Sequence, residues 1–119
     1  MPRAVDGTRR HDRRKKIQRE AKGFWGRKKN TFRTAKDAVT RAGQYAYRDR
    51  KNRKRDFRRL WITRISAACR AEGITYSRLI SGLNKAHIEI NRKALSNMAI
   101  EDRPAFNAVV AKAKEALGV

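Results

Sequence analysis

Residues 31–72 read TFRTAKDAVTRAGQYAYRDRKNRKRDFRRLWITRISAACRAE, with no proline to interrupt them. Apolar residues recur there in steps of three and four, and they are Phe32, Ala35, Val39, Ala42, Tyr45 and Ala46, then Phe57, Leu60, Trp61, Ile65, Ala68 and Cys69. These steps match the turn of an α-helix. The stretch is therefore predicted to form one long helix, or two collinear helices, ending near Gly73.

The centre of this stretch, residues 47–59, reads YRDRKNRKRDFRR. Charged side chains are almost never fully buried unless they are paired. A helix of this composition cannot bury a wide stripe of its surface in protein. Its neighbours are expected to be phosphate groups.

The whole chain of 119 residues carries a formal net charge of +21, from 32 Lys and Arg against 11 Asp and Glu. Such a charge opposes compaction by self-repulsion, so an anionic partner is expected. Nucleic acid is the densest common polyanion. An anionic membrane is the other candidate, but no apolar run approaches the ~20 residues of a spanning helix. No signal peptide is expected either, because Arg3, Arg9 and Arg10 flank no apolar segment.

The positive charge is concentrated in the first half of the chain. Residues 1–60 hold 23 Lys and Arg against 6 Asp and Glu, whereas residues 61–119 hold 9 against 5. The predicted fold is all-α, with a long basic N-terminal helical extension (residues 1–59) and a small globular helical C-terminal domain (residues 60–119). Gly23 and Gly26, two glycines within four residues, predict a hinge near residues 23–26 of the extension.

The C-terminal half is predicted to contain three short helices. Their N-caps are expected at Thr75 or Ser77, at Asn91, and at Asp102, where Pro104 falls in the first turn. Their apolar faces and the end of the long helix are expected to share one small core, which includes Leu60, Trp61, Ile65, Phe106, Val109, Val110, Ala113 and Leu117. A core built from so few residues is only marginally stable.

The candidate RNA-binding residues are mostly cations in short runs, which are typical phosphate contacts. They are Arg9, Arg10, Arg13, Arg14, Lys15, Lys16, Lys22, Phe24, Trp25, Arg27, Lys28, Lys29, Asn30, Arg33, Tyr47, Arg48, Arg50, Lys51, Asn52, Arg53, Lys54, Arg55, Arg58, Arg59, Arg64, Arg92 and Lys93.

The aromatic residues among these cations have two interpretations. An aromatic residue at helical spacing is more often core than a stacking platform, so Tyr45, Phe57 and Trp61 are expected to pack inside the protein. Phe24 and Trp25 lie between glycines in a basic loop. For these two, stacking on unpaired bases and shaping of the hinge are both open.

No constellation of residues predicts catalysis. The single cysteine, Cys69, cannot form an internal disulfide, is expected to be a small buried residue, and fits a reducing cytoplasm. His11 and His87 have no zinc-site spacing, and Ser77 and His87 have no acidic third partner. The glycines around Phe24 lack the Gly-Lys-Ser/Thr ending of a phosphate-binding loop. We therefore expect no enzyme activity, no metal, no cofactor and no small-molecule substrate.

Three stretches resemble a known family. They are AKGFWGRKKNTFRTAKDAV (21–39), AGQYAYRDRKNRKRDFRRLWITRISAA (42–68) and YSRLISGLNKAHIEINRKALSNMAI (76–100). They resemble the bacterial large-subunit ribosomal protein number twenty, and the likeness runs from about residue 9 to residue 117. Asp6 and Asp12 depart from its more basic tail, so the resemblance assigns no contacts to residues 1–12.

The resemblance implies an all-helical cytoplasmic protein of the ribosome that binds large-subunit (23S) rRNA directly. It implies a role early in assembly of the large subunit, beside neighbouring ribosomal proteins, and no part in peptidyl transfer. It also implies an extension that threads among rRNA helices.

Two other classes of protein share the strong positive charge. An architectural DNA-binding protein would need a recognition helix with a dimer interface, or an apolar wedge for the minor groove. A membrane-active cationic helix would need a continuous apolar face, which residues 47–59 lack.

Overall fold

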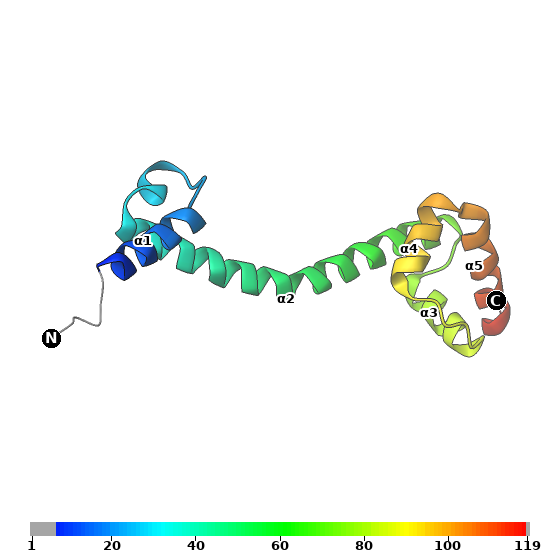
Figure 1. The fold of residues 1–119 in the computed structure, drawn as a ribbon. Helices are drawn as coiled ribbons and strands as arrows, with labels where there is room; N and C mark the ends of the chain where they lie inside the picture. Colours follow the sequence, from blue (N-terminus) through cyan, green and yellow to red (C-terminus); the bar gives the residue numbers. More distant parts are fainter. Residues whose placement is uncertain (1–6, 119) are drawn as a thin grey trace. The chain divides into compact units, whose positions relative to one another are not determined.

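The computed structural model describes residues 7–118, and these residues form helices and connecting turns with no β-strand. The all-α class predicted from the sequence is confirmed. Arg3 and Asp6 lie outside the described residues. The elements in chain order (Figure 1) are α1 (Thr8–Glu20), a short 3-10 turn η1 (Gly26–Lys29), α2 (Phe32–Ala71), α3 (Tyr76–Lys85), α4 (Arg92–Glu101) and α5 (Arg103–Leu117).

Helix α2 is a single helix of 40 residues. It ends where Gly73 takes a φ of 69°, a conformation that glycine adopts without a steric penalty. The N–H of Ile74 donates to the carbonyl of Cys69 at 3.0 Å, and that of Gly73 to the carbonyl of Arg70 at 3.2 Å. This is the Schellman arrangement, which satisfies the last carbonyls of a helix. Among the described helices, none has the length and apolar composition of a membrane span.

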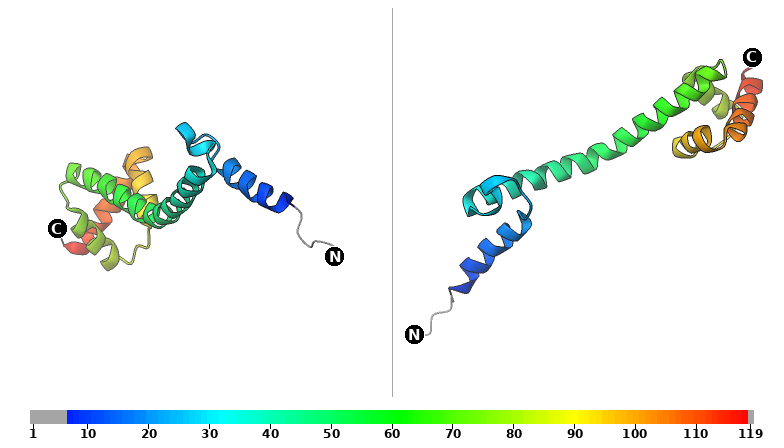
Figure 2. Two further views of the ribbon diagram at one scale, coloured as in Figure 1. Left: turned by 90° about the vertical axis from the view of Figure 1, so that its left-hand side faces the viewer. Right: turned by 90° about the horizontal axis from the view of Figure 1, so that it is seen from above.

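The chain divides into two compact units between Lys51 and Asn52, inside α2. In the second unit, α3, α4 and α5 gather around the C-terminal end of α2 (Figure 2). Its buried core consists of Ile65, Ala68, Cys69, Ile74, Leu79, Leu83, Leu95, Ala99, Phe106, Val110 and Ala113. Cys69 is fully buried, as predicted from its place on an apolar helix face.

The three short helices begin at caps that the sequence predicted. The side chains of Thr75, Asn91 and Asp102 accept hydrogen bonds from backbone N–H groups three residues later, at 3.4, 2.8 and 3.0 Å. These bonds satisfy N–H groups that the first turn of a helix leaves without a partner. Gly118, with a φ of 73°, ends α5.

The first unit contains α1, η1 and the beginning of α2. Its core is small, because Ala21 and Ala35 are the buried hydrophobic residues among those described there. Gln18 Nε2 donates to the carbonyl of Asn30 at 3.0 Å, which ties α1 to the turn before α2. Gly23 and Gly26 have φ values of 87° and 64°, so the loop between α1 and α2 turns through conformations that favour glycine.

The predicted packing of two aromatic residues and one leucine was wrong. Tyr45, Phe57 and Leu60 are 53%, 49% and 40% exposed, and Trp61 is only half-buried. Helix α2 contributes to the core only from Ile65 onward. The helical period identifies a face of α2, but every residue from 40 to 60 is exposed, so that face is not covered in the middle of the helix.

Candidate nucleic-acid interface

The middle of α2 is exposed on all its faces. Every residue from 40 to 60 is exposed, and this segment carries nine Lys and Arg against two Asp. Successive residues of a helix point 100° apart, so the cations surround the axis. A helix with cations on all sides can contact more than one polyanionic surface at once.

Ion pairs relieve little of this charge. Within residues 7–118, Arg48 Nε meets Asp49 Oδ1 at 2.8 Å, and Arg59 Nη1 meets Asp56 Oδ1 at 3.8 Å. Both pairs are well exposed to solvent, where such contacts contribute little to stability.

The remaining cations repel one another along the helix. Four pairs of cations are four residues apart, and they are Arg50 and Lys54, Lys51 and Arg55, Lys54 and Arg58, and Arg55 and Arg59. Like charges at this spacing each destabilise a helix by about 0.2–0.5 kcal/mol. A bound polyanion removes this repulsion.

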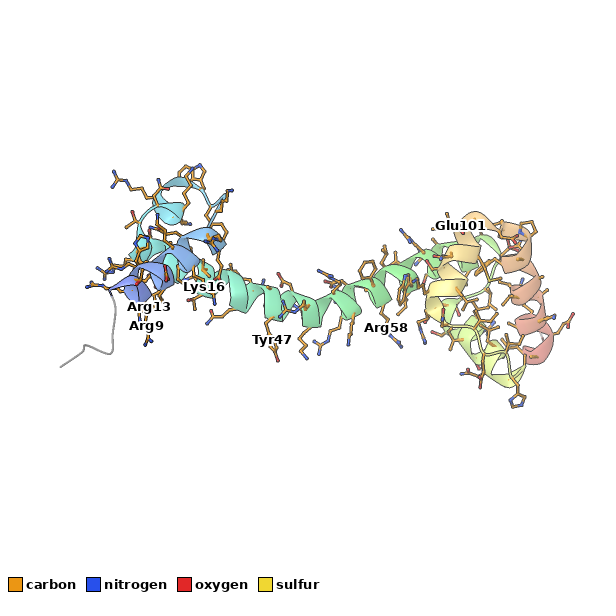
Figure 3. The ribbon with its side chains drawn as sticks, in the orientation of Figure 1. Arg9, Arg13, Lys16, Tyr47, Arg58 and Glu101 are labelled. Carbon is orange, nitrogen blue, oxygen red and sulfur yellow. The ribbon has the colours of Figure 1, made fainter. Side chains whose placement is uncertain are left out.

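Helix α1 carries a stripe of cations. Arg9, Arg13 and Lys16 are spaced four and three residues apart, which places them on one face, and all three are exposed (Figure 3). Arg14 lies differently, with its guanidinium 5.4 Å from the centre of the Phe32 ring. Arg14 therefore joins α1 to the start of α2, besides presenting charge to solvent.

The loop between α1 and α2 forms one side of an open hollow. Its lining residues are Phe24, Trp25, Lys28, Ala38, Arg41, Ala42 and Tyr45. Trp25 is 89% exposed, whereas Phe24 is half-buried. The sequence predicted Phe24 and Trp25 here, and the structure adds Tyr45 and Arg41. Tyr45 was missed because its helical spacing pointed to packing.

The second unit holds Arg92 in place through a side chain that the sequence analysis missed. Arg92 Nε donates to the hydroxyl of Tyr76 at 2.7 Å, and Arg92 is half-buried. The neighbouring Lys93 is exposed. Nothing in the sequence indicated this role for Tyr76, because Tyr76 occupies an apolar position of α3.

Lys114 differs from these cations. Its Nζ donates to the carbonyl of Glu72 at 2.8 Å, so this lysine stabilises the fold of the second unit.

The predicted RNA-binding residues all lie within the described part of the chain. All are exposed except Phe24 and Arg92, which are half-buried. They occupy α1, the loop with η1, the exposed part of α2 and the start of α4. None of them is fully buried, so all of them are accessible to a partner.

The described residues offer little for covalent chemistry. Burial raises the pKa of the Cys69 thiol, which keeps the thiol protonated and weakly nucleophilic. Between residues 7 and 118, no three His, Cys, Asp or Glu side chains group as metal ligands would. The exposed cations of α1 and α2 instead suit these helices to contact a polyanion.

Comparison with known proteins identifies the family of this chain. The profile of the family described as Ribosomal protein L20 matches residues 3–109. The chain belongs to this family, as the resemblance of its three stretches indicated.

Curated relatives agree with this assignment. Proteins named Large ribosomal subunit protein bL20 from Bartonella henselae and Rhizobium etli are each 61% identical over 117 residues. The match covers 98% of this chain and 88% and 87% of theirs. The protein of that name from Treponema denticola is 59% identical over 119 residues, with both chains fully covered.

Proposed function

We propose that this chain is a structural component of the large ribosomal subunit in the cytoplasm, with no catalytic role. It binds large-subunit (23S) rRNA directly and supports assembly of that subunit next to other ribosomal proteins. The basic extension, residues 1–59, lies between rRNA helices, and the domain formed by residues 60–119 packs on folded rRNA. The relatives are named as proteins of the large ribosomal subunit, which supports the proposed location in that subunit.

The exposed cationic part of α2, residues 40–60, is the observation that carries this proposal. rRNA helices that pack closely repel one another through their phosphates. A single α-helix is only ~10–12 Å wide, side chains included. It can therefore lie between two RNA helices and neutralise the phosphates of both. Arginine suits this task, because its planar guanidinium can bridge two phosphate oxygens.

Recognition of a particular rRNA region is proposed to come from shape and unpaired bases. The deep, narrow major groove of an RNA duplex hides the base edges from side chains. Exposed rings such as Trp25 and Tyr47 can stack on bases that are not paired. The cations then fix the position of the chain on the RNA backbone.

Crosslinking of the full-length protein to RNA in cells, followed by sequencing of the bound segments, tests the proposal. We expect crosslinks on large-subunit rRNA from residues of the extension and from the start of α4. A competition assay in vitro should show that large-subunit rRNA displaces the protein from duplex DNA, and that the reverse exchange is poor. Crosslinks spread over unrelated RNAs, or a preference for duplex DNA, would refute the proposal.

A further inference from the structure

Two aromatic rings of α2 form one wall of an open groove in the second unit. Phe57 and Trp61 are one helical turn apart, with ring centres 6.2 Å apart and ring planes inclined by 35°. The groove has a volume of about 530 Å³ and is completed by Arg53, Lys54 and, from α4, Lys93. The surface that lines it is mostly carbon.

A second, more polar hollow adjoins this groove. Its lining includes Arg58, Asn91 and Arg92, and it shares Lys54, Trp61 and Lys93 with the first. The hydrogen bond from Arg92 Nε to Tyr76 fixes the guanidinium at this place. The two hollows together present an aromatic wall bordered by five cations.

We propose that this groove binds one unpaired RNA nucleotide, with the base lying on the rings of Phe57 and Trp61. The phosphates on either side of that base contact Lys54, Lys93 and the Arg92 guanidinium. This proposal rests on the function proposed above and assigns a stacking site to residues outside the predicted RNA-binding set.

The ring geometry limits how the base can lie. Stacked bases are about 3.4 Å apart, so a base held between two parallel rings would need them about 6.8 Å apart. The observed rings are closer and inclined. The base therefore lies on the outside of the aromatic wall, toward the open side of the groove.

The charges around the groove favour a nucleotide over an apolar protein segment. A flat apolar base attached to anionic phosphates matches a carbon-lined wall with cations at its border. An apolar protein segment would cover the rings but would also desolvate several cations without a partner, which costs free energy. Contact between the two rings does not bury them, because Phe57 remains 49% exposed.

Trp61 fluorescence in the full-length protein tests the site. The chain has two tryptophans, so Trp25→Phe leaves Trp61 as the only indole while keeping a ring at residue 25. The probes are single-stranded oligoadenylate, an abasic strand of the same length and backbone, and a fully paired RNA duplex. We expect the oligoadenylate to quench Trp61, and the abasic strand and the duplex to leave its fluorescence nearly unchanged.

Affinity measurements with substituted proteins complete the test. Stacking of one base should make oligoadenylate bind about 5- to 150-fold tighter than the abasic strand. Phe57→Leu keeps an apolar side chain and should remove much of this ratio. Ile100→Ala changes another exposed apolar residue, 62% exposed on α4 and outside the groove, and should leave the ratio unchanged.

The outcomes separate this proposal from the general function. Equal quenching by the abasic strand, or no quenching by any strand while large-subunit rRNA still binds, would overturn the nucleotide site and leave the function standing. Quenching of Trp61 only when a second ribosomal protein is added would assign the groove to a protein partner. Failure to bind large-subunit rRNA at all would reject the proposed function itself.

Discussion

Gly82 of α3 lies directly against Ala113 of α5, so closely that a Cβ atom on Gly82 would be 2.5 Å from the carbonyl oxygen of Ala113. The obstacle is backbone, which cannot rotate away as a long side chain can. Both residues are buried in the core of the second unit. The crossing of α3 and α5 therefore requires glycine at this position.

Gly82→Ala should lower the stability of the second unit by about 1–3 kcal/mol, the usual cost of overpacking a core. Gly43→Ala is the matched control, because a Cβ at Gly43 in α2 would meet nothing within 4 Å. That control should stabilise its helix by about 0.5–1 kcal/mol. Cys69 is the only cysteine and is fully buried, so its rate of reaction with a thiol reagent measures opening of the unit. If Cys69 reacted no faster in Gly82→Ala than in the unsubstituted protein, the close contact between α3 and α5 would be contradicted.

Ser96→Ala should stabilise the same unit. Ser96 is fully buried in α4, and its Oγ has no hydrogen-bond partner among the described residues. A buried hydroxyl without a partner costs about 1–3 kcal/mol, and alanine removes it. Ser81→Ala, at an exposed position of α3, controls for the better helix propensity of alanine. We expect thermal unfolding to show a larger gain for Ser96→Ala, and an equal gain in both would disprove the cost of the hydroxyl.

The exposed part of α2 should be the first segment cleaved by trypsin in the free protein. Residues 41–59 hold nine Lys and Arg, and every one of these residues is exposed. Exposed segments with few contacts open most easily. Large-subunit rRNA should suppress these cuts and raise the helical signal in circular dichroism. Survival of an intact fragment spanning residues 1–60, with loss of the C-terminal half, would reverse this order.

Replacement of both Phe24 and Trp25 by alanine should weaken binding to large-subunit rRNA more than binding to random RNA. Stacking on an unpaired base contributes about 1–3 kcal/mol and requires a particular RNA loop. The expected loss for large-subunit rRNA is therefore at least about fivefold. Equal losses on both RNAs would mean that the two rings only shape the turn between α1 and α2.

The salt dependence of rRNA binding should locate the electrostatic contact on α2. If about ten phosphates are neutralised, log affinity should fall with log salt with a slope of roughly seven to nine. Replacing Arg53, Lys54 and Arg55 by glutamine keeps helix propensity and should reduce this slope by about two to three.

A second triple substitution, Arg78, Arg103 and Lys112 to glutamine, removes the same charge from exposed positions of α3 and α5. It should leave the slope nearly unchanged. Filter binding across a range of salt concentrations measures both proteins. Equal reductions would show that total charge matters and that its place on α2 does not.

Much of the fold was predictable because its determinants are local in the sequence. An unbroken helical period and the absence of proline define α2, and the side chains of Thr75, Asn91 and Asp102 begin the three short helices. The uneven charge is likewise a property of composition. These features depend on residues within a turn or two of one another, so the amino-acid order alone determined them.

The tertiary structure decided which residues of each apolar face find a partner. Ile65 is fully buried and Phe57, two turns earlier on the same helix, is not, because α3, α4 and α5 reach only the end of α2. Tyr76 supports Arg92 from 16 positions away. Such contacts depend on where distant helices come to lie, and helical periodicity carries no information about that.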